Sequence, residues 1–119
     1  MQISAGALDF EWMGDWAQLP SADSVARGWA HHGAAFSTEG QIVTFHPTES
    51  LVVILTTDGK LVRSFKVTVI EAHGLTLATH GCIQSIWLAD NGRKRTPDTG
   101  YEYPQGDGVV TGQVVKTTL

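Results

Sequence analysis

One pattern recurs in this chain at a spacing of 41 residues. Three pairs of positions carry it: Gly33 and Gly74, Gly40 and Gly81, and Ile42 and Ile83. In both copies the second glycine separates two short segments rich in apolar residues, as the turn of a β-hairpin does. A β-rich unit that repeats about every 40 residues is typical of a propeller blade, which has four short strands. The sequence therefore predicts an all-β chain built from blade-like units.

The first unit contains a complete set of predicted strands, at residues 34–37, 41–45, 51–55 and 61–65. The third of these is an unbroken apolar run, which is expected of a strand covered on both faces. The hairpin turn that follows it contains Asp58 and Gly59, since glycine adopts positive φ readily. Residues 67–70 alternate in polarity, so we expect a strand-like segment that leads into a turn at His73 and Gly74.

The second unit is shorter by one strand, with predicted strands at residues 75–79, 83–89 and 114–118. Its third strand repeats residues 53–57 at an offset of 61, which exceeds the 41-residue period by 20. We assign this excess to a loop insertion at residues 91–110, where families often vary their function. The predicted fold is a partial β-propeller over residues 31–119, with one full and one incomplete four-stranded blade in antiparallel meanders.

Such a partial propeller needs partners, because each blade buries its faces against its neighbours. Radial repeats close with typically 4–8 blades. We therefore expect the remaining blades of a parent propeller, or another chain that pairs with an edge strand, to complete the structure. A small molecule or peptide is a further possible partner.

The first 30 residues lack the repeat and are predicted to form an extended arm. Residues 8–12 alternate between apolar and acidic side chains, which is typical of a half-exposed strand. Trp16 and Trp29 are expected to fill gaps on a larger surface, because tryptophan buries a large area. Residues 24–30 are predicted to contain one helical turn.

The composition argues against several classes of function. A net charge of −4 disfavours a general nucleic-acid binder, which needs a basic face. Cys82 is the only cysteine, so neither an internal disulfide nor a cysteine-based zinc cluster is expected, and a buried, inert thiol is predicted. No apolar run is long enough for a membrane span, and the first twenty residues contain no basic side chain. We therefore expect a cytoplasmic protein without a membrane partner.

Residues 31–92 resemble the NHL-type six-bladed β-propellers, and are most similar to the branch that includes the peptidyl-α-hydroxyglycine α-amidating lyase. The resemblance is carried by the spacing Gly-x6-Gly-x-Ile at residues 33–42, Asp-Gly-Lys-Leu-Val at 58–62, Ser-Phe at 64–65, His-Gly-Leu-Thr-Leu at 73–77 and Ile-Trp-Leu-Ala-Asp-Asn-Gly at 86–92. These motifs are more specific for the fold than for the chemistry, since propellers include enzymes, binders and scaffolds.

The resemblance implies metal ligands in a central channel. It assigns His73 to zinc and the Leu75 main-chain carbonyl to calcium, with His32 as a weaker second histidine; imidazole nitrogen suits zinc and backbone oxygen suits calcium. The alternative role for His73 is to cap the end of a strand. The lyases carry a catalytic His-Arg pair where this chain has His46 and Pro47, and proline has no side-chain donor that would stabilise an anion. The family's catalytic tyrosine has no counterpart among these 119 residues, so no catalytic residue is assigned.

Other residues are candidates for binding surfaces or for structural roles. Tyr101, Tyr103 and His46 are predicted to face a ligand or partner; the tyrosines alternatively hold the insertion against the blade. Asp90 is expected to accept hydrogen bonds from turn amides. The favoured function is an NHL-type scaffold that binds a ligand or protein. The alternatives are a metal-dependent lyase or hydrolase, and a structural repeat whose edge strands recruit another chain.

Overall fold

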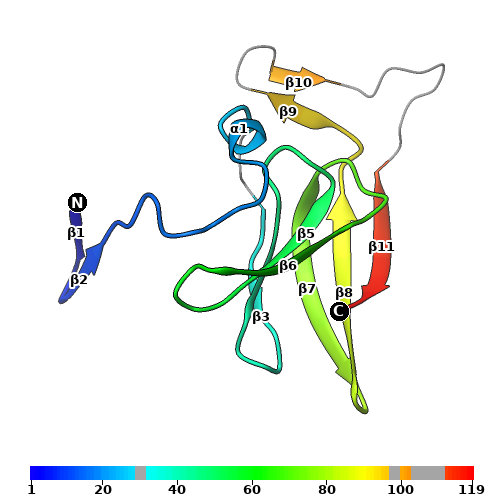
Figure 1. Ribbon diagram of the computed structural model, residues 1–119, viewed down its shortest axis with the longest axis horizontal. Coiled ribbons are helices and arrows are strands. Elements are labelled where there is room, and N and C mark those ends of the chain that lie inside the picture. Colours follow the sequence, from blue (N-terminus) through cyan, green and yellow to red (C-terminus); the bar gives the residue numbers. More distant parts are fainter. Residues whose placement is uncertain (29–31, 97–99, 103–111) are drawn as a thin grey trace.

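The computed structural model describes residues 1–28, 32–96, 100–102 and 112–119. Most of the strand residues belong to two antiparallel sheets, with a separate hairpin at the N-terminal end (Figure 1). The first sheet has the order β3 (Ala35–Phe36), β4 (Ile42–Phe45), β5 (Leu51–Leu55), β6 (Leu61–Lys66). The second sheet has the order β11 (Gln113–Thr118), β8 (Ile83–Asp90), β7 (Ala72–His80). The other elements are β1 (Gln2–Ala5), β2 (Leu8–Glu11), α1 (Ala22–Val25), β9 (Lys94–Thr96) and β10 (Gly100–Glu102).

This topology confirms the predicted fold class. The first sheet is a four-stranded antiparallel meander, and the second is a three-stranded sheet in which β7, β8 and β11 follow the order of β3, β4 and β5. The predicted complete and incomplete units are therefore both present. In the part of the chain that the structure describes, the two sheets do not close into a barrel or a full propeller.

The main hydrophobic core lies between the two sheets. Val43, Val52 and Ile54 of the first sheet pack in one cluster with Ile86 and Leu88 of the second, and all five are fully buried. Each of these side chains alternates along its strand with residues of the opposite face, as the period of a β-strand requires. The two sheets therefore pack face to face, as neighbouring blades do.

Strand β5 is buried along its whole length, as its apolar sequence predicts. Leu51, Val53 and Leu55 point away from the second sheet and form a separate cluster, which the N-terminal arm covers with Trp16 and Leu19. The expected packing role of Trp16 is therefore confirmed.

The arm is attached at the turn between β5 and β6. The amide of Gln18 donates a hydrogen bond of 2.8 Å to the carbonyl of Gly59. Gly59 has a φ of 83°, and a Cβ atom built on it would lie only 1.9 Å from the carbonyl oxygen of Trp16. Glycine is thus required here by both the backbone conformation and the close approach of the arm.

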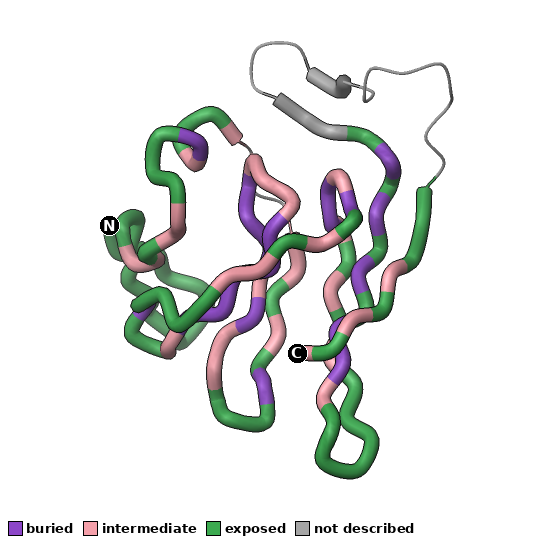
Figure 2. Tube along the Cα trace, turned by 45° about the vertical axis from the view of Figure 1, so that its right-hand side comes forward, coloured by how far each residue is buried: buried purple, intermediate pink, exposed green. Residues whose placement is uncertain are grey.

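The beginning of the arm differs from the prediction. Residues 8–12 were expected to be half exposed, but β2 is exposed along its whole length and pairs only with β1 (Figure 2). The predicted helical turn is present but begins earlier, as α1 at Ala22–Val25. No helix in the described residues is both long and apolar enough to cross a membrane.

The hairpin turns of the repeat are present, but the predicted turn at His73 and the predicted burial of Cys82 are wrong. Gly40 and Gly81 both have positive φ, 76° and 60°, so the hairpin turns do recur at the predicted spacing. His73 and Gly74 form no turn; they lie inside β7, where a register shift marks a bulge. Cys82 was expected to be buried, but it is exposed, because it lies in the loop that joins β7 to β8.

The predicted strand-like segment at residues 67–70 forms no strand. Its backbone is bonded elsewhere: the amide of Val67 donates to the carbonyl of Ser50, and the amide of Ile70 donates to the carboxylate of Asp90. The alternating polarity of residues 67–70 reflects the burial of Val69 in the core, and these residues do not pair with a neighbouring strand.

Candidate functional site

The inner strands of the two sheets meet at the histidines that the resemblance singled out. The amide of Gly33 donates a hydrogen bond of 3.3 Å to the carbonyl of His73. A Cβ atom on Gly33 would lie 3.2 Å from the backbone nitrogen of Leu75, so the two chain segments are in close contact. Positions 40 and 42 residues apart are thus neighbours in space, close to the 41-residue period and as expected for the innermost strands of adjacent blades.

The two imidazole rings at this junction have different partners. Nδ1 of His32 lies 2.8 Å from the carbonyl oxygen of Ala72, and its ring packs edge-on against Phe45 with centroids 5.3 Å apart. Nε2 of His73 lies 3.0 Å from the side-chain nitrogen of Asn91. Because a carbonyl only accepts, Nδ1 of His32 carries the proton. Each ring is therefore bonded to a different partner, although the two chain segments that carry the histidines are in contact.

The zinc and calcium assignment is not accompanied by a cluster of ligating side chains in the described residues. Those residues contain no group of three or more His, Cys, Asp or Glu side chains placed to hold a metal ion. His73 is already bonded to an amide side chain, and zinc needs at least three protein ligands. Leu75 is half buried and packs against the main core. The predicted assignment of these residues to zinc and calcium thus has no support in the geometry of this part of the chain.

His46 is not on a binding surface, which corrects the prediction. Its side chain is fully buried. Nδ1 accepts hydrogen bonds from the backbone amides of Thr48, at 3.1 Å, and Glu49, at 2.9 Å, and Nε2 lies 3.0 Å from the carbonyl oxygen of Pro20. These partners require the tautomer with the proton on Nε2. The ring joins the loop after β4 to the N-terminal arm and has a structural role.

Asp90 is a second structural centre at the end of β8. Its carboxylate accepts hydrogen bonds from the amides of Ile70, Glu71 and Gly92 and from the side chain of Gln113, at 2.8 to 3.2 Å. Burial raises the pKa of this carboxyl, but the amide bonds from Ile70 and Gly92, with the bond from Gln113, outweigh burial and hold the pKa below its usual range. The predicted bonding to turn amides is confirmed and extends to β11.

An apolar hollow in the described residues lies under the N-terminal arm. It has a volume of about 220 Å³ and is lined by Trp16, Leu19, His32, Ile42 and Leu55, among others. This volume is below the roughly 300–1,000 Å³ of typical ligand sites. The hydroxyl of Thr44, which also lines it, is bonded to the carbonyl of Gly33. The hollow therefore offers apolar contact but few polar groups to orient a ligand.

The second sheet presents a face and an edge that no described element covers. We call the side that points away from the first sheet the open face. Ladder pairs place its residues in rows, with Thr76, Trp87 and Lys116 in one row and Gly74, Ala89 and Val114 in the next. Val114 is 67% exposed and Trp87 is 42% exposed, and the Lys116 ammonium lies 5.3 Å from the centre of the Trp87 ring. Strand β11 is the outer edge of this sheet.

The remaining predicted binding residues fall largely outside the description. The backbone of Tyr101 belongs to β10, which pairs with β9, but its side chain is not described. Tyr103 lies outside the described residues, as does most of the predicted insertion. The open face, by contrast, was not predicted as a surface, although alternation of apolar residues in β11 gives a weak indication of it.

Comparison with protein-family models, with curated proteins and with solved structures finds no match to this chain. The likeness to NHL propellers therefore rests on the sequence motifs and remains a prediction. What the chain does has to be inferred from its exposed surfaces and from its paired and unpaired strands.

Proposed function

We propose that this chain is part of an NHL-type β-propeller scaffold, and that it binds a protein by taking up a β-strand along the outer edge of β11. The observation that supports this is the difference between the two sheets. Among the described residues the first sheet has four strands and the second has three, and no strand there is the equivalent of β6, which would lie beside β11.

The corresponding strand of the first sheet, β5, is paired on both sides, by β4 and β6. Among the described residues, β11 is paired on one side, by β8, and its side chains are exposed or half buried. An edge strand leaves a row of backbone N–H and C=O groups available for pairing with another chain. Addition of a strand at such an edge gives affinity through backbone bonds, while the side chains give specificity. The incoming strand comes either from further blades of a parent protein or from a separate partner.

A synthetic peptide with the sequence of residues 56–67, which contain β6 and its preceding turn, tests this proposal. The peptide should bind to the full chain and slow the hydrogen exchange of alternate amides along β11, because added backbone bonds protect them. The matched control is the same peptide with Val62→Pro, which removes one backbone donor and disfavours a strand. If the β11 amides are as well protected without peptide as those of β8, or if saturating peptide leaves them unchanged, the proposal fails.

The second candidate is a metal-dependent lyase or hydrolase, favoured only by the hydrogen bond from the Gly33 amide to the His73 carbonyl, which brings His73 close to the segment that carries His32. Since the described residues contain no cluster of three or more metal-ligating side chains, we derive no reaction for it. Metal analysis of the purified chain separates the candidates. One zinc per chain, lost in His73→Ala but kept in the surface variant His80→Ala, would support the enzyme, and zinc that is equally bound by both variants would count against it.

A further inference from the structure

The loop that follows β8 begins with Asn91 and Gly92, and Asn91 is the only asparagine in the chain. Asn91 is exposed, and Gly92 has a φ of 75°. Asparagine followed by glycine deamidates readily, because glycine has no Cβ atom to hinder the approach of its nitrogen to the side-chain carbonyl carbon. This pair is therefore a candidate site of spontaneous covalent modification.

The reaction needs water as its only co-reactant. The nitrogen of Gly92 forms a bond to Cγ of Asn91, the bond from Cγ to Nδ2 breaks, and Nδ2 leaves as ammonia with the proton that the Gly92 nitrogen gave up. Water then opens the five-membered succinimide ring by adding to one of its two carbonyl carbons. Opening at Cγ leaves an aspartate at position 91. Opening at the main-chain carbonyl leaves an isoaspartate, in which the backbone runs through the side chain.

Three hydrogen bonds hold the reacting groups in the folded loop. The amide of Gly92 donates to the carboxylate of Asp90 at 2.9 Å. The side chain of Asn91 is held at both ends, since Oδ1 accepts from the amide of Arg93 at 3.0 Å and Nδ2 lies 3.0 Å from Nε2 of His73. Because the side-chain nitrogen of asparagine only donates, Nε2 of His73 is the acceptor. The attacking nitrogen and the carbonyl it attacks are thus both bonded to other groups.

Each of these bonds opposes one part of the ring closure. Loss of the Gly92 proton would leave a negative charge on a nitrogen that faces the Asp90 carboxylate, and two like charges at this distance repel. The side chain of Asn91 has to rotate to bring Cγ onto that nitrogen, and its bonds to Arg93 and His73 resist the rotation. The barrier to the reaction in the folded loop therefore includes the free energy of breaking these bonds.

We propose that Asn91 is a site of spontaneous deamidation that stays unmodified while the loop after β8 is folded and is modified when that loop opens. A chain that has opened at this loop is thereby marked by a covalent change that refolding does not reverse. The inference makes no use of the outer edge of β11 and does not depend on strand binding there.

The modified loop should close less well, because its surroundings leave little room. A Cβ atom on Gly112 would lie 3.0 Å from the carbonyl oxygen of Asp90 and 3.6 Å from Cα of Asn91, so the segment that leads into β11 packs directly on this loop. An isoaspartate adds one methylene to the backbone here, and either product adds a negative charge next to Asp90. Purified deamidated chain should therefore unfold at a lower urea concentration than unmodified chain, and an unchanged midpoint would contradict this consequence.

Mass spectrometry of aged samples is the first test. The full chain and a synthetic peptide of residues 86–96 are incubated at the same mildly alkaline pH, and the tryptic fragment 67–93 of the chain is assayed for the mass gain of amide-to-carboxyl conversion. The folded chain should react at least about tenfold more slowly than the peptide, because its hydrogen bonds must break first. Asn91→Gln should abolish the gain, since glutamine does not form the five-membered ring. A folded chain that reacts as fast as the peptide, or a gain that survives Asn91→Gln, overturns the proposal.

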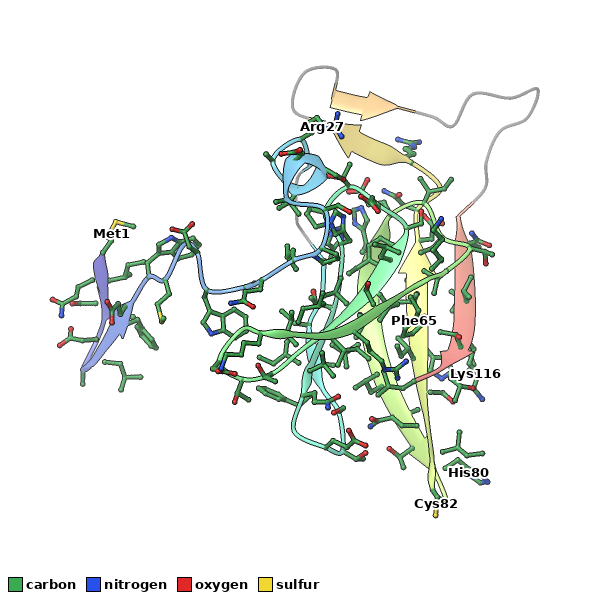
Figure 3. All side chains as sticks on the ribbon, viewed as in Figure 1. Met1, Arg27, Phe65, His80, Cys82 and Lys116 are labelled. Atoms are coloured by element: carbon green, nitrogen blue, oxygen red, sulfur yellow. The ribbon has the colours of Figure 1, made fainter. Side chains whose placement is uncertain are left out.

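A second test removes one of the bonds. His73→Ala deletes the acceptor for Nδ2 of Asn91 and should raise the deamidation rate of the folded chain several-fold. The matched control is His80→Ala, on the same strand but at the tip of the β7–β8 hairpin, the opposite end of this ladder from Asp90 (Figure 3). It should react like the unmodified chain, and equal rates in the two variants would contradict the role of His73.

A urea series on the unmodified chain tests the proposal without any substitution. The deamidation rate should rise with the fraction of unfolded chain and reach the rate of the peptide when unfolding is complete. A rate that stays flat through the unfolding transition overturns the proposal. Peptide binding at β11 is measured separately, so the strand-binding function is judged on its own result.

Discussion

Replacement of Asp90 by asparagine tests the carboxylate that bonds to three backbone amides and to the side chain of Gln113. One oxygen accepts from the amides of Glu71, at 3.2 Å, and Gly92, at 2.9 Å. The other accepts from the amide of Ile70, at 2.8 Å, and from Nε2 of Gln113, at 3.1 Å. Asparagine keeps one oxygen and places an N–H donor where the other was, so two of these bonds are lost. At about 1.5 kcal/mol for each bond to a charged group, the variant should be less stable by about 3 kcal/mol.

The stability that the Asp90 carboxylate contributes depends on pH. The pKa of Asp90 in the folded chain lies below its usual range, because hydrogen bonds to the ionised form outweigh the effect of burial. The unfolded chain binds this proton near pH 3.9. The carboxylate therefore contributes its full stability above about pH 4, and loses it as the pH falls through the lower folded value. Asparagine has no carboxyl proton to bind, so the difference in unfolding free energy between the unmodified chain and Asp90→Asn should become smaller in acid.

Urea unfolding followed by far-UV circular dichroism, at pH 7 and at pH 3, measures both quantities. A suitable control is Asp58→Asn, because the pKa of Asp58 is also lowered, by Lys60 and Thr56, but the side chains of Asp58 and Lys60 are 60% and 66% exposed. Exposed ion pairs contribute little, so this variant should unfold like the unmodified chain. The reasoning about Asp90 would be refuted by a loss under about 1 kcal/mol at pH 7, or by a loss that is the same at pH 3.

Three further substitutions test the packing of the arm and of the core. Gly59→Ala should lower the free energy of unfolding by about 2 kcal/mol or more and release Trp16, which would appear as a red shift of tryptophan emission. The control is Gly40→Ala, which has a similar φ but no atom within 4 Å of the new Cβ. It should lower the free energy of unfolding by only about 1 kcal/mol and leave the emission unchanged. His46→Ala should cost about 3 kcal/mol in urea unfolding, because buried partners lose their bonds; full stability would show that the ring is not structural. Ile54→Ala should cost about 3 kcal/mol, since the side chain is fully buried between the sheets, and a loss under about 1 kcal/mol would contradict a packed core there.

The strands of both units follow closely from local sequence patterns. The apolar run at residues 51–55 became β5, and it is covered on both faces as such runs require. The turns at Gly40 and Gly81 follow from the need for positive φ, which glycine meets without strain. These features depend on neighbours along the chain, so the chain order alone predicts them.

The candidate site was less predictable. His46 reads as an exposed loop histidine, but its ring bonds to Pro20, 26 residues earlier, and no local pattern reveals such a partner. Whether His73 holds a metal depends on which other ligands converge on it, and the described residues bring it Asn91 instead. The open face was not predicted, because only a weak repeat marks the segment that forms β11. The exposure of this face also depends on whether another layer covers it, and no described element does so.

By itself, the sequence determined that the chain forms two antiparallel β units 41 residues apart, since alternation, turn glycines and apolar runs are local properties. Only the tertiary structure decided that the arm packs Trp16 against the first sheet, that Asp90 joins distant amides, and that Leu8, Phe10 and Trp12 of the hairpin are exposed. The physical reason is that burial and hydrogen bonding between distant segments depend on how the sheets are placed. That placement follows from the packing of the whole chain and not from any one stretch of it.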